Sequence, residues 1–268
     1  MLCVIQIDQG MQKTNAWSVI TKNTMRILLL DIETAPNTVH VWGLYDQNVA
    51  INQIISTGYV MCWSAKWHNE RKIFFDSIKK SKHKEMLNKV HSLMDEADAI
   101  IHYNGKKFDI PTLQKEFILH GLKPPAPYKQ IDLLDTARHQ FRFVSNKLDF
   151  VAQQLKLGNK IPHTGHQLWI DCMANKPEAW NLMERYNKHD VVLLERVYNR
   201  LLPWIQNHPN RNVFDGTKGC PNCGKKHFQP RGFSFTSTKK YQRYLCRDCG
   251  TWFRSDKPEK RILSDNSS

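Results

Sequence analysis

Short apolar runs alternate with helical stripes over most of the chain. The run 26–32 is bulky and uninterrupted, which predicts a buried strand. The segments 58–67 and 71–77 predict two more strands, joined by a turn. In the segment 84–97, apolar residues at 86, 87, 90, 93 and 94 lie on one face of a helix.

The same alternation continues beyond this first helix. We expect a strand at 97–104 and helices at 111–118, 148–157 and 177–202. The segment QIDLLDT (130–136) continues the alternation between the first two of these helices. Pro111 suits the start of its helix, Gly158 ends the next, and Pro203 stops the last. A cluster of strands followed by strands alternating with helices predicts an α/β fold, with a mixed sheet flanked by helices.

The pattern also predicts where the chain divides. We expect an N-terminal extension at 1–24, a main domain at 25–205, a linker at 206–217, a small module at 218–256 and a polar tail at 257–268. The extension is polar and weakly patterned, so a short ordered arm and a dispensable segment both fit it.

Charge separates these parts. The chain has 268 residues and a net charge of +14, from 39 Lys and Arg against 25 Asp and Glu. Residues 211–268 hold 13 of the basic and five of the acidic residues, a net charge of +8. Such a surplus favours a polyanionic partner, nucleic acid before a membrane surface.

Cysteine usage and the chain start bear on the compartment. Seven cysteines, four of them in two C-x-x-C pairs, indicate metal chemistry in a reducing compartment. No cationic start followed by an apolar core precedes the first strand, and no apolar run approaches the roughly 20 residues of a membrane span. We therefore expect a cytoplasmic protein, near the nucleoid or, if viral, in the host cytoplasm.

Carboxylates recur at the ends of the predicted elements. Asp31 and Glu33, two residues apart on a strand, point to one side. Asp109 lies where a strand passes into a helix, and Asp190 lies four residues after Tyr186, on one helix face. Each residue alone has an ordinary structural explanation. Together they predict a cluster at one sheet edge that needs Mg²⁺ or Mn²⁺ to offset its charge.

The segments DIE (31–33), NGKKFD (104–109) and YNKHD (186–190) resemble, in order and separation, the three motifs of the DEDD superfamily of 3′–5′ exonucleases. The resemblance covers about residues 25–202 and implies a ribonuclease H-like fold. Position 185 is Arg where the histidine branch has His, and Tyr186 indicates the tyrosine branch, DEDDy. His189 is the alternative base, but it points roughly 100° away from Asp190.

The resemblance implies phosphodiester hydrolysis with two Mg²⁺ or Mn²⁺ ions. Asp31 would bridge both ions, Glu33 and Asp190 would hold the ion that activates water, and Asp109 the ion at the leaving oxygen. Tyr186 would orient the attacking water.

Two further motif residues and one lysine are expected to contact substrate. The resemblance implies that Asn104 and Phe108 place the terminal nucleotides, although Phe108 equally fits a core position. Lys160 is a candidate phosphate contact, and a solvated loop lysine is the alternative. Asp132 is left outside the predicted site.

Four cysteines predict a structural zinc ribbon. Cys220 and Cys223 form one C-x-x-C-G turn, Cys246 and Cys249 form another, and 22 residues separate them. Two such turns provide the four thiolates of one tetrahedral Zn²⁺ site. His227 is a rival ligand whose spacing fits poorly, and a redox pair would need only one C-x-x-C.

The ribbon interleaves aromatic and basic residues, a composition typical of nucleic-acid surfaces. We expect Arg231, Arg243, Tyr244 and Trp252 to contact nucleic acid, with some of the rings forming the small core instead.

The sequence thus predicts a metal-dependent 3′–5′ exonuclease that prefers DNA and acts alone or beside a separate DNA polymerase, without a membrane. The DNA preference follows the resemblance to family-B polymerase proofreading domains. An RNA 3′ exonuclease and an inactive nucleic-acid-binding adaptor are the alternatives.

Overall fold

A computed structural model describes residues 24–259 of the chain. Residues 1–23 of the expected extension and 260–268 of the expected tail lie outside the described residues. In chain order the elements are β1 (Ile27–Thr34), β2 (Thr38–Val39), the 3₁₀ turn η1 (Ile51–Gln53), β3 (Ile54–Ser56), β4 (Val60–Trp67), β5 (Ile73–Ser77), α1 (His83–Asp95), β6 (Ala99–His102), α2 (Asp109–Leu119), β7 (Lys129–Asp132), α3 (Leu133–Gln140), α4 (Leu148–Gln154), α5 (His166–Met173), α6 (Pro177–Leu201), η2 (Leu202–Trp204), α7 (Arg211–Asp215), β8 (Phe228–Phe235), β9 (Lys240–Cys246) and β10 (Trp252–Arg254).

The main sheet has five strands in the order β5-β4-β1-β6-β7. The central strand β1 pairs antiparallel with β4 and parallel with β6. The outer pairs follow the same division, since β4–β5 is antiparallel and β6–β7 is parallel. The predicted α/β fold with a mixed sheet is therefore confirmed.

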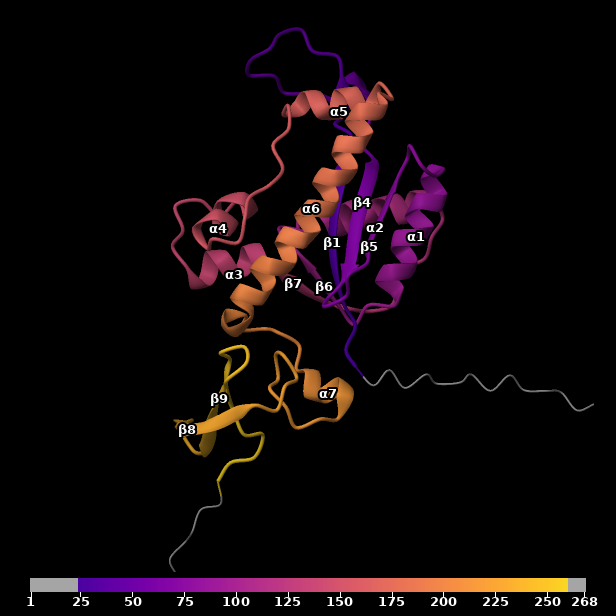
Figure 1. The fold of residues 1–268 in the computed structure, drawn as a ribbon. Helices are drawn as coiled ribbons and strands as arrows, with labels where there is room; N and C mark the ends of the chain where they lie inside the picture. Colours follow the sequence, from indigo (N-terminus) through magenta and orange to yellow (C-terminus); the bar gives the residue numbers. More distant parts are fainter. Residues whose placement is uncertain (1–23, 260–268) are drawn as a thin grey trace, which may run out of the picture.

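Helices cover both faces of this sheet (Figure 1). Leu28, Leu30 and Ile32 of β1 join the apolar cluster that contains residues of α1 and α2. Ile27 and Leu29, one residue out of phase, join the cluster formed with α4 and α6. The alternation of β1 thus directs its odd-numbered positions towards α6, which crosses the sheet along its length.

Several helix boundaries differ from those expected. Helix α2 begins at Asp109, so Pro111 is its third residue, where an N–H has no partner within the helix anyway. Helix α4 ends at Gln154 rather than 157, because Lys156 adopts a φ of 58° two residues before Gly158. Helix α5 was not predicted.

The expected linker contains a short helix, α7. The side chain of Asn210 caps its start by accepting a hydrogen bond from the backbone N of Asn212. Gly216 ends the helix in the left-handed region, with a φ of 63°. The segment is therefore more ordered than its polar composition suggested.

A second sheet, in the order β10-β9-β8, forms the small C-terminal β module. It lies at the C-terminal end of α6 (Figure 1). Asn222 Nδ2 donates to the carbonyl of Leu202 at 3.0 Å, and Cys223 and Cys249 pack against the apolar cluster that includes the end of α6. The module is thus docked on the main fold. Within residues 24–259, no helix is both long enough and apolar enough to cross a bilayer.

Candidate functional site

Three carboxylates converge where β1 meets α6. Asp31 and Glu33 continue the face of β1 that turns towards this helix, and Asp190 extends from the helix. One oxygen of each carboxylate lies within 4.8 Å of the other two. The structure therefore brings together three of the four acids selected from the sequence, here called the acid cluster.

Asp109, the fourth acid, reaches the same strand from the start of α2. Its Oδ1 accepts a hydrogen bond from the backbone N of Ile32 at 3.2 Å, and the side chain is buried. This contact places Asp109 beside the peptide between Asp31 and Glu33, although no oxygen of Asp109 joins the group within 4.8 Å.

Burial and mutual repulsion make these acids hard to ionise without a cation. Burial, followed by the charge of Asp190, raises the pKa of Asp31 well above its usual range. Burial raises the pKa of Glu33 to about 8 and that of Asp109 to about 6. It also raises the pKa of Asp190, against the lowering effect of Lys160.

Lys160 enters the acid cluster from the loop after α4. Its Nζ lies 2.6 Å from Asp190 Oδ2 and donates to the hydroxyl of Tyr186 at 2.9 Å. Burial alone would lower the pKa of Lys160, but Asp190, Tyr186 and Asp31 outweigh it and raise the pKa. The loop lysine is therefore partly buried at the acids rather than solvated.

Tyr186 lies one helical turn before Asp190, as the spacing predicted. Burial and the charge of Asp190 raise its pKa, so the phenol keeps its proton at neutral pH. The rings of His163 and Trp169 pack edge-on against it, with centroids 4.8 and 6.2 Å away. The other candidate base, His189, directs Nε2 to the carbonyl of Asn159 at 2.9 Å.

The donor set of the acid cluster fits hard divalent cations. Asp190 Oδ1 is buried and has no hydrogen-bond partner among the described residues. Asn187, which sequence reasoning missed, is fully buried and donates from Nδ2 to Asp31 Oδ2 at 2.6 Å, which orients that carboxylate. Convergent carboxylate oxygens with an unpaired lone pair are the ligands that Mg²⁺ and Mn²⁺ prefer.

A cleft of about 590 Å³ opens beside the acid cluster. Asp31, Asn104 and Lys160 line it together with Arg138 and Lys147, two cations that the sequence did not single out. A cleft that contains one carboxylate of the acid cluster together with cationic side chains suits a chain of phosphates. Phe108 is 44% exposed, so it is not a core anchor.

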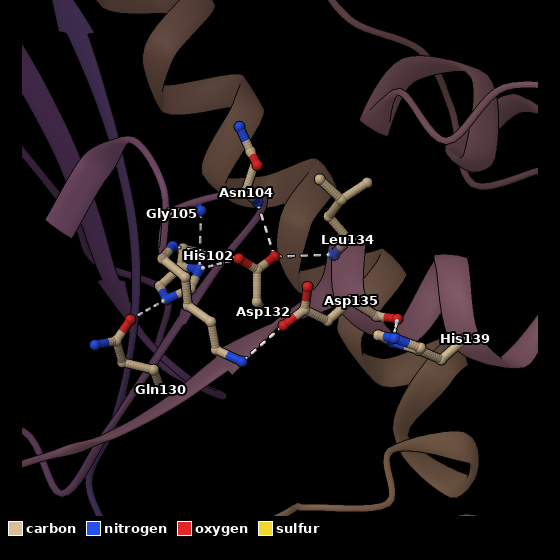
Figure 2. Close-up of polar contacts among 9 residues, drawn as sticks. His102, Asn104, Gly105, Gln130, Asp132, Leu134, Asp135 and His139 are labelled. Atoms are coloured by element: carbon tan, nitrogen blue, oxygen red, sulfur yellow. Dashed lines mark hydrogen bonds and ion pairs between the residues drawn. The ribbon is translucent and has the colours of Figure 1, made fainter. Parts of the chain in front are cut away.

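The turn that carries Asn104 is held by a buried aspartate (Figure 2). Asp132 Oδ1 accepts from the backbone N of Asn104 at 2.8 Å and of Leu134 at 3.0 Å, and Oδ2 accepts from that of Lys106 at 3.3 Å. Asn104 has a left-handed φ of 69°, a conformation that asparagine adopts more readily than most residues other than glycine.

The next residue of that turn, Gly105, packs against His102. A Cβ on Gly105 would lie 2.3 Å from Cγ of His102, so only glycine fits. His102 Nδ1 also lies 3.4 Å from Asp132 Oδ2, and Nε2 lies 3.2 Å from Gln130 Oε1. The turn is therefore held by Asp132 through hydrogen bonds and by His102 through packing against Gly105. In the sequence, the only sign of this role was an Asp at the end of a strand, followed by a helix.

The four module cysteines converge. Their Sγ atoms all lie within 4.8 Å of one another, with Cys220 and Cys249 at 3.6 Å and Cys223 and Cys246 at 3.7 Å. Thiolates ~2.3 Å from one tetrahedral Zn²⁺ would be ~3.8 Å apart, so the cluster fits zinc. His227 is not in this group; its Nδ1 lies 3.8 Å from Asp248 Oδ2.

Strand register sorts the module's rings into two faces. Tyr244 stacks on Phe253 and meets Phe228 edge-on, so these three rings pack together. On the other face Arg243 lies over the ring of Trp252, which is 51% exposed. Tyr244 thus belongs to the ring cluster, whereas Arg243 and Trp252 share a basic aromatic face.

Arg231 and Arg254 lie near that face. The carbonyl of Arg231 accepts a hydrogen bond from Nε of Arg243 at 3.0 Å. Arg254 lies over the ring of Tyr241, with 4.2 Å between its guanidinium carbon and the ring centroid.

The mixed sheet with an acid cluster on its central strand defines a class of α/β proteins with ribonuclease H-like topology. Residues 28–202 match the RNase_H superfamily, and the chain belongs to it. The predicted ribonuclease H-like fold is thereby confirmed, and the family supports a nuclease.

A solved structure gives the same fold. The family B DNA polymerase from the hyperthermophilic archaeon Pyrobaculum calidifontis is similar to this chain with a TM-score of 0.50 and 17% sequence identity. The match covers 81% of this chain and 32% of the polymerase, so the chain spans about a third of that protein's length. No curated protein matches the sequence.

Proposed function

We propose that this protein is a metal-dependent 3′–5′ exonuclease of the DEDDy branch, with DNA as its preferred substrate. The observation that carries the proposal is the acid cluster itself, in which Asp190, one of whose oxygens is unpaired, lies with Asp31 and Glu33 beside a cleft lined partly by cations.

The acids would hold two Mg²⁺ or Mn²⁺ ions. Asp31, Glu33 and Asp190 would hold one, and Asp31 together with Asp109 would hold the other. When bound, such ions activate water and neutralise charge at the phosphate and at the leaving oxygen. The raised pKa values of the four acids agree with this assignment, since the cations would replace the protons that the acids otherwise keep.

The remaining residues would bind and orient the substrate. Tyr186 keeps its proton, so its hydroxyl is suited to orienting water by a hydrogen bond rather than to acting as a strong base. Lys160 supplies a positive charge beside that hydroxyl. Asn104 lines the cleft and Phe108 is exposed near it in sequence, which suits stacking and hydrogen bonding at a terminal nucleotide.

The C-terminal module would bind one Zn²⁺ through Cys220, Cys223, Cys246 and Cys249 and present Arg243 and Trp252 to nucleic acid. An apolar core of three rings is small for a segment of this length, so zinc would supply much of its folding free energy.

The test uses 5′-labelled single-stranded DNA and RNA of the same sequence, with Mg²⁺ or Mn²⁺. We expect both strands to be shortened from the 3′ end, the DNA faster than the RNA, and neither strand to be shortened when its 3′ end is blocked. Asp31→Ala should lose roughly 10³-fold in rate, since a held metal supplies several kcal/mol.

Each other outcome rejects a stated part of the proposal. Faster cleavage of RNA would support the RNA exonuclease. Shortening of neither polymer would support the inactive adaptor, and an equally active Asp31→Ala variant would show that the site is wrong.

A further inference from the structure

We propose that His83, Glu116 and His120 form a binding site for a zinc-class transition-metal ion, separate from the acid cluster and from the four cysteines. His83 is the first residue of α1. Glu116 and His120 lie four residues apart near the end of α2, which places both side chains on one face of that helix.

The distances fit a single ion. One donor atom from each residue lies within 4.8 Å of the other two. Both imidazoles approach the same oxygen, Glu116 Oε2, from 3.6 Å for His83 Nε2 and 3.8 Å for His120 Nε2. These separations are too long for hydrogen bonds, whereas nitrogen and oxygen ligands ~2.1 Å from one tetrahedral ion lie ~3.4 Å apart.

The polar groups of this cluster are not satisfied by each other. His83 Nε2 is buried and has no hydrogen-bond partner among residues 24–259. The Glu116 side chain is 3% exposed, so its carboxylate needs compensating positive charge, and a lysine supplies this at one of its two oxygens only. Lys115 Nζ lies 2.9 Å from the other oxygen, Oε1, and also donates to the carbonyl of Gly58, which leaves Oε2 to the imidazoles.

The chemistry of the donors distinguishes this site from the other two. Two imidazoles and one carboxylate suit zinc-class ions, whereas the acid cluster offers oxygen ligands and the cysteine cluster thiolates. Both rings are partly exposed, so water can complete the coordination. Burial lowers the pKa of His83, which favours the neutral ring that coordinates a metal.

Such an ion would fasten the start of α1 to the end of α2. The other end of α2 carries Asp109, seven residues or about 10 Å along the helix from Glu116. The site therefore stands apart from the acid cluster and does not depend on the proposed nuclease activity.

The experiment titrates Co²⁺ into the full chain, with zinc already bound to the cysteines and excess Mg²⁺ present to occupy the acids. We expect one equivalent of Co²⁺ to bind with the visible absorption of nitrogen and oxygen ligands and without thiolate charge transfer. His83→Ala and His120→Ala should each weaken Co²⁺ binding by more than roughly 10–100-fold. That range is the usual loss when a residue that only hydrogen-bonds to a metal ligand is removed. His91→Ala is the matched control, since it removes another partly buried imidazole of α1 that packs on Phe117 of α2 but lies outside this group, and it should bind as the wild type does.

Equal binding by the wild type and both alanine variants would overturn the proposal, as would the absence of any such equivalent in the wild type. If a variant does not fold, crystals of the wild type soaked in Zn²⁺ decide instead. An anomalous peak at coordination distance from both Nε2 atoms and Oε2 supports the site, and no peak there overturns it.

Discussion

Replacing Asp132 by Asn should disable the turn that carries Asn104 while leaving the size of the side chain unchanged. The carboxylate accepts hydrogen bonds from three backbone N–H groups, those of residues 104, 106 and 134. An amide offers one oxygen, so two of these bonds lose the charge of their acceptor and the third N–H faces an NH₂ group. At about 1 kcal/mol for each weakened bond and about 1 for the unpaired donor, the expected loss of unfolding free energy is about 3 kcal/mol.

Asp132→Asn should also reduce activity, because the turn that Asp132 holds carries residues of the proposed site. The turn leads directly into α2, whose first residue is Asp109, so a displacement of this backbone moves both Asn104 and that carboxylate. Misplacement by about 1 Å can cost about 10²-fold in rate. We expect kcat on single-stranded DNA to fall by about that factor, with a smaller change in KM, because the cationic residues of the cleft are untouched.

Asp135→Asn, in the first turn of the helix that Asp132 caps, is the matched control. Asp135 forms an exposed ion pair with Lys106 at 2.7 Å, which is visible beside Asp132 in Figure 2 and contributes little. Thermal melting and single-turnover rates of both variants, measured well below the melting temperature, separate stability from positioning. Equal behaviour of the two variants would refute the assignment of Asp132 as the residue that positions this turn.

Three other perturbations test separate parts of the structure. Cys249→Ser should release zinc, detected by a chromogenic chelator, and lower the melting temperature of the whole chain because the module packs on the end of α6; an unchanged melt would contradict that packing. Arg243→Ala should weaken single-stranded DNA binding and reduce its salt slope by about 0.7, measured by fluorescence anisotropy against Lys84→Ala on α1, and equal slopes would argue against this face. Burial lowers the pKa of His208 to about 4, below its unfolded value, so the unfolded chain binds the extra proton between pH 6.5 and 4. Stability should therefore fall by about 3 kcal/mol over that range in denaturant titrations, and His208→Gln should show a smaller fall; an identical pH profile would contradict this reasoning.

The residues that sequence reasoning found share a local pattern. Asp31 and Glu33 follow from strand alternation, Tyr186 and Asp190 from helical spacing, and the cysteines from two short turns. In each case the geometry within one motif is set by at most five residues of chain, although the motifs themselves come from distant segments. The fold class was accessible for the same reason, since apolar periodicity is also local.

The interactions that were missed join distant segments. Lys160 was selected from the sequence only as a phosphate contact, and its ion pair with Asp190 spans 30 residues. Asp132, which was left outside the predicted site, accepts a hydrogen bond from the backbone N of Asn104 across 28 residues. The spacing of residues along the sequence does not indicate such contacts, because they depend on how the loops pack against the sheet. Asn187 lay inside a selected motif, but only the packing of α6 on β1 gives its amide a role.

The module shows a third limit. Its alternation of rings and basic residues was evident, but the face of each ring depends on how β8 and β10 pair with β9. The register of β8 shifts between Pro230 and Phe233, and this bulge puts Phe228 and Phe233, five residues apart, on one face. Tyr244 and Trp252 lie on opposite faces because Trp252 pairs with Leu245, a register between β9 and β10 that the sequence does not report.

The most direct test of the central claim is the Mg²⁺ dependence of 3′-end cleavage by the wild type and by Asp190→Asn. The substitution keeps the shape of a side chain that is 1% exposed but removes the charge that would hold a cation. Both proteins are compared on 5′-labelled single-stranded DNA at saturating substrate, with the zinc content of the module verified. We expect Mg²⁺-dependent shortening from the 3′ end for the wild type and a rate roughly 10³-fold lower for the variant. Equal rates for the two proteins, or cleavage by the wild type that does not depend on a divalent cation, would contradict it.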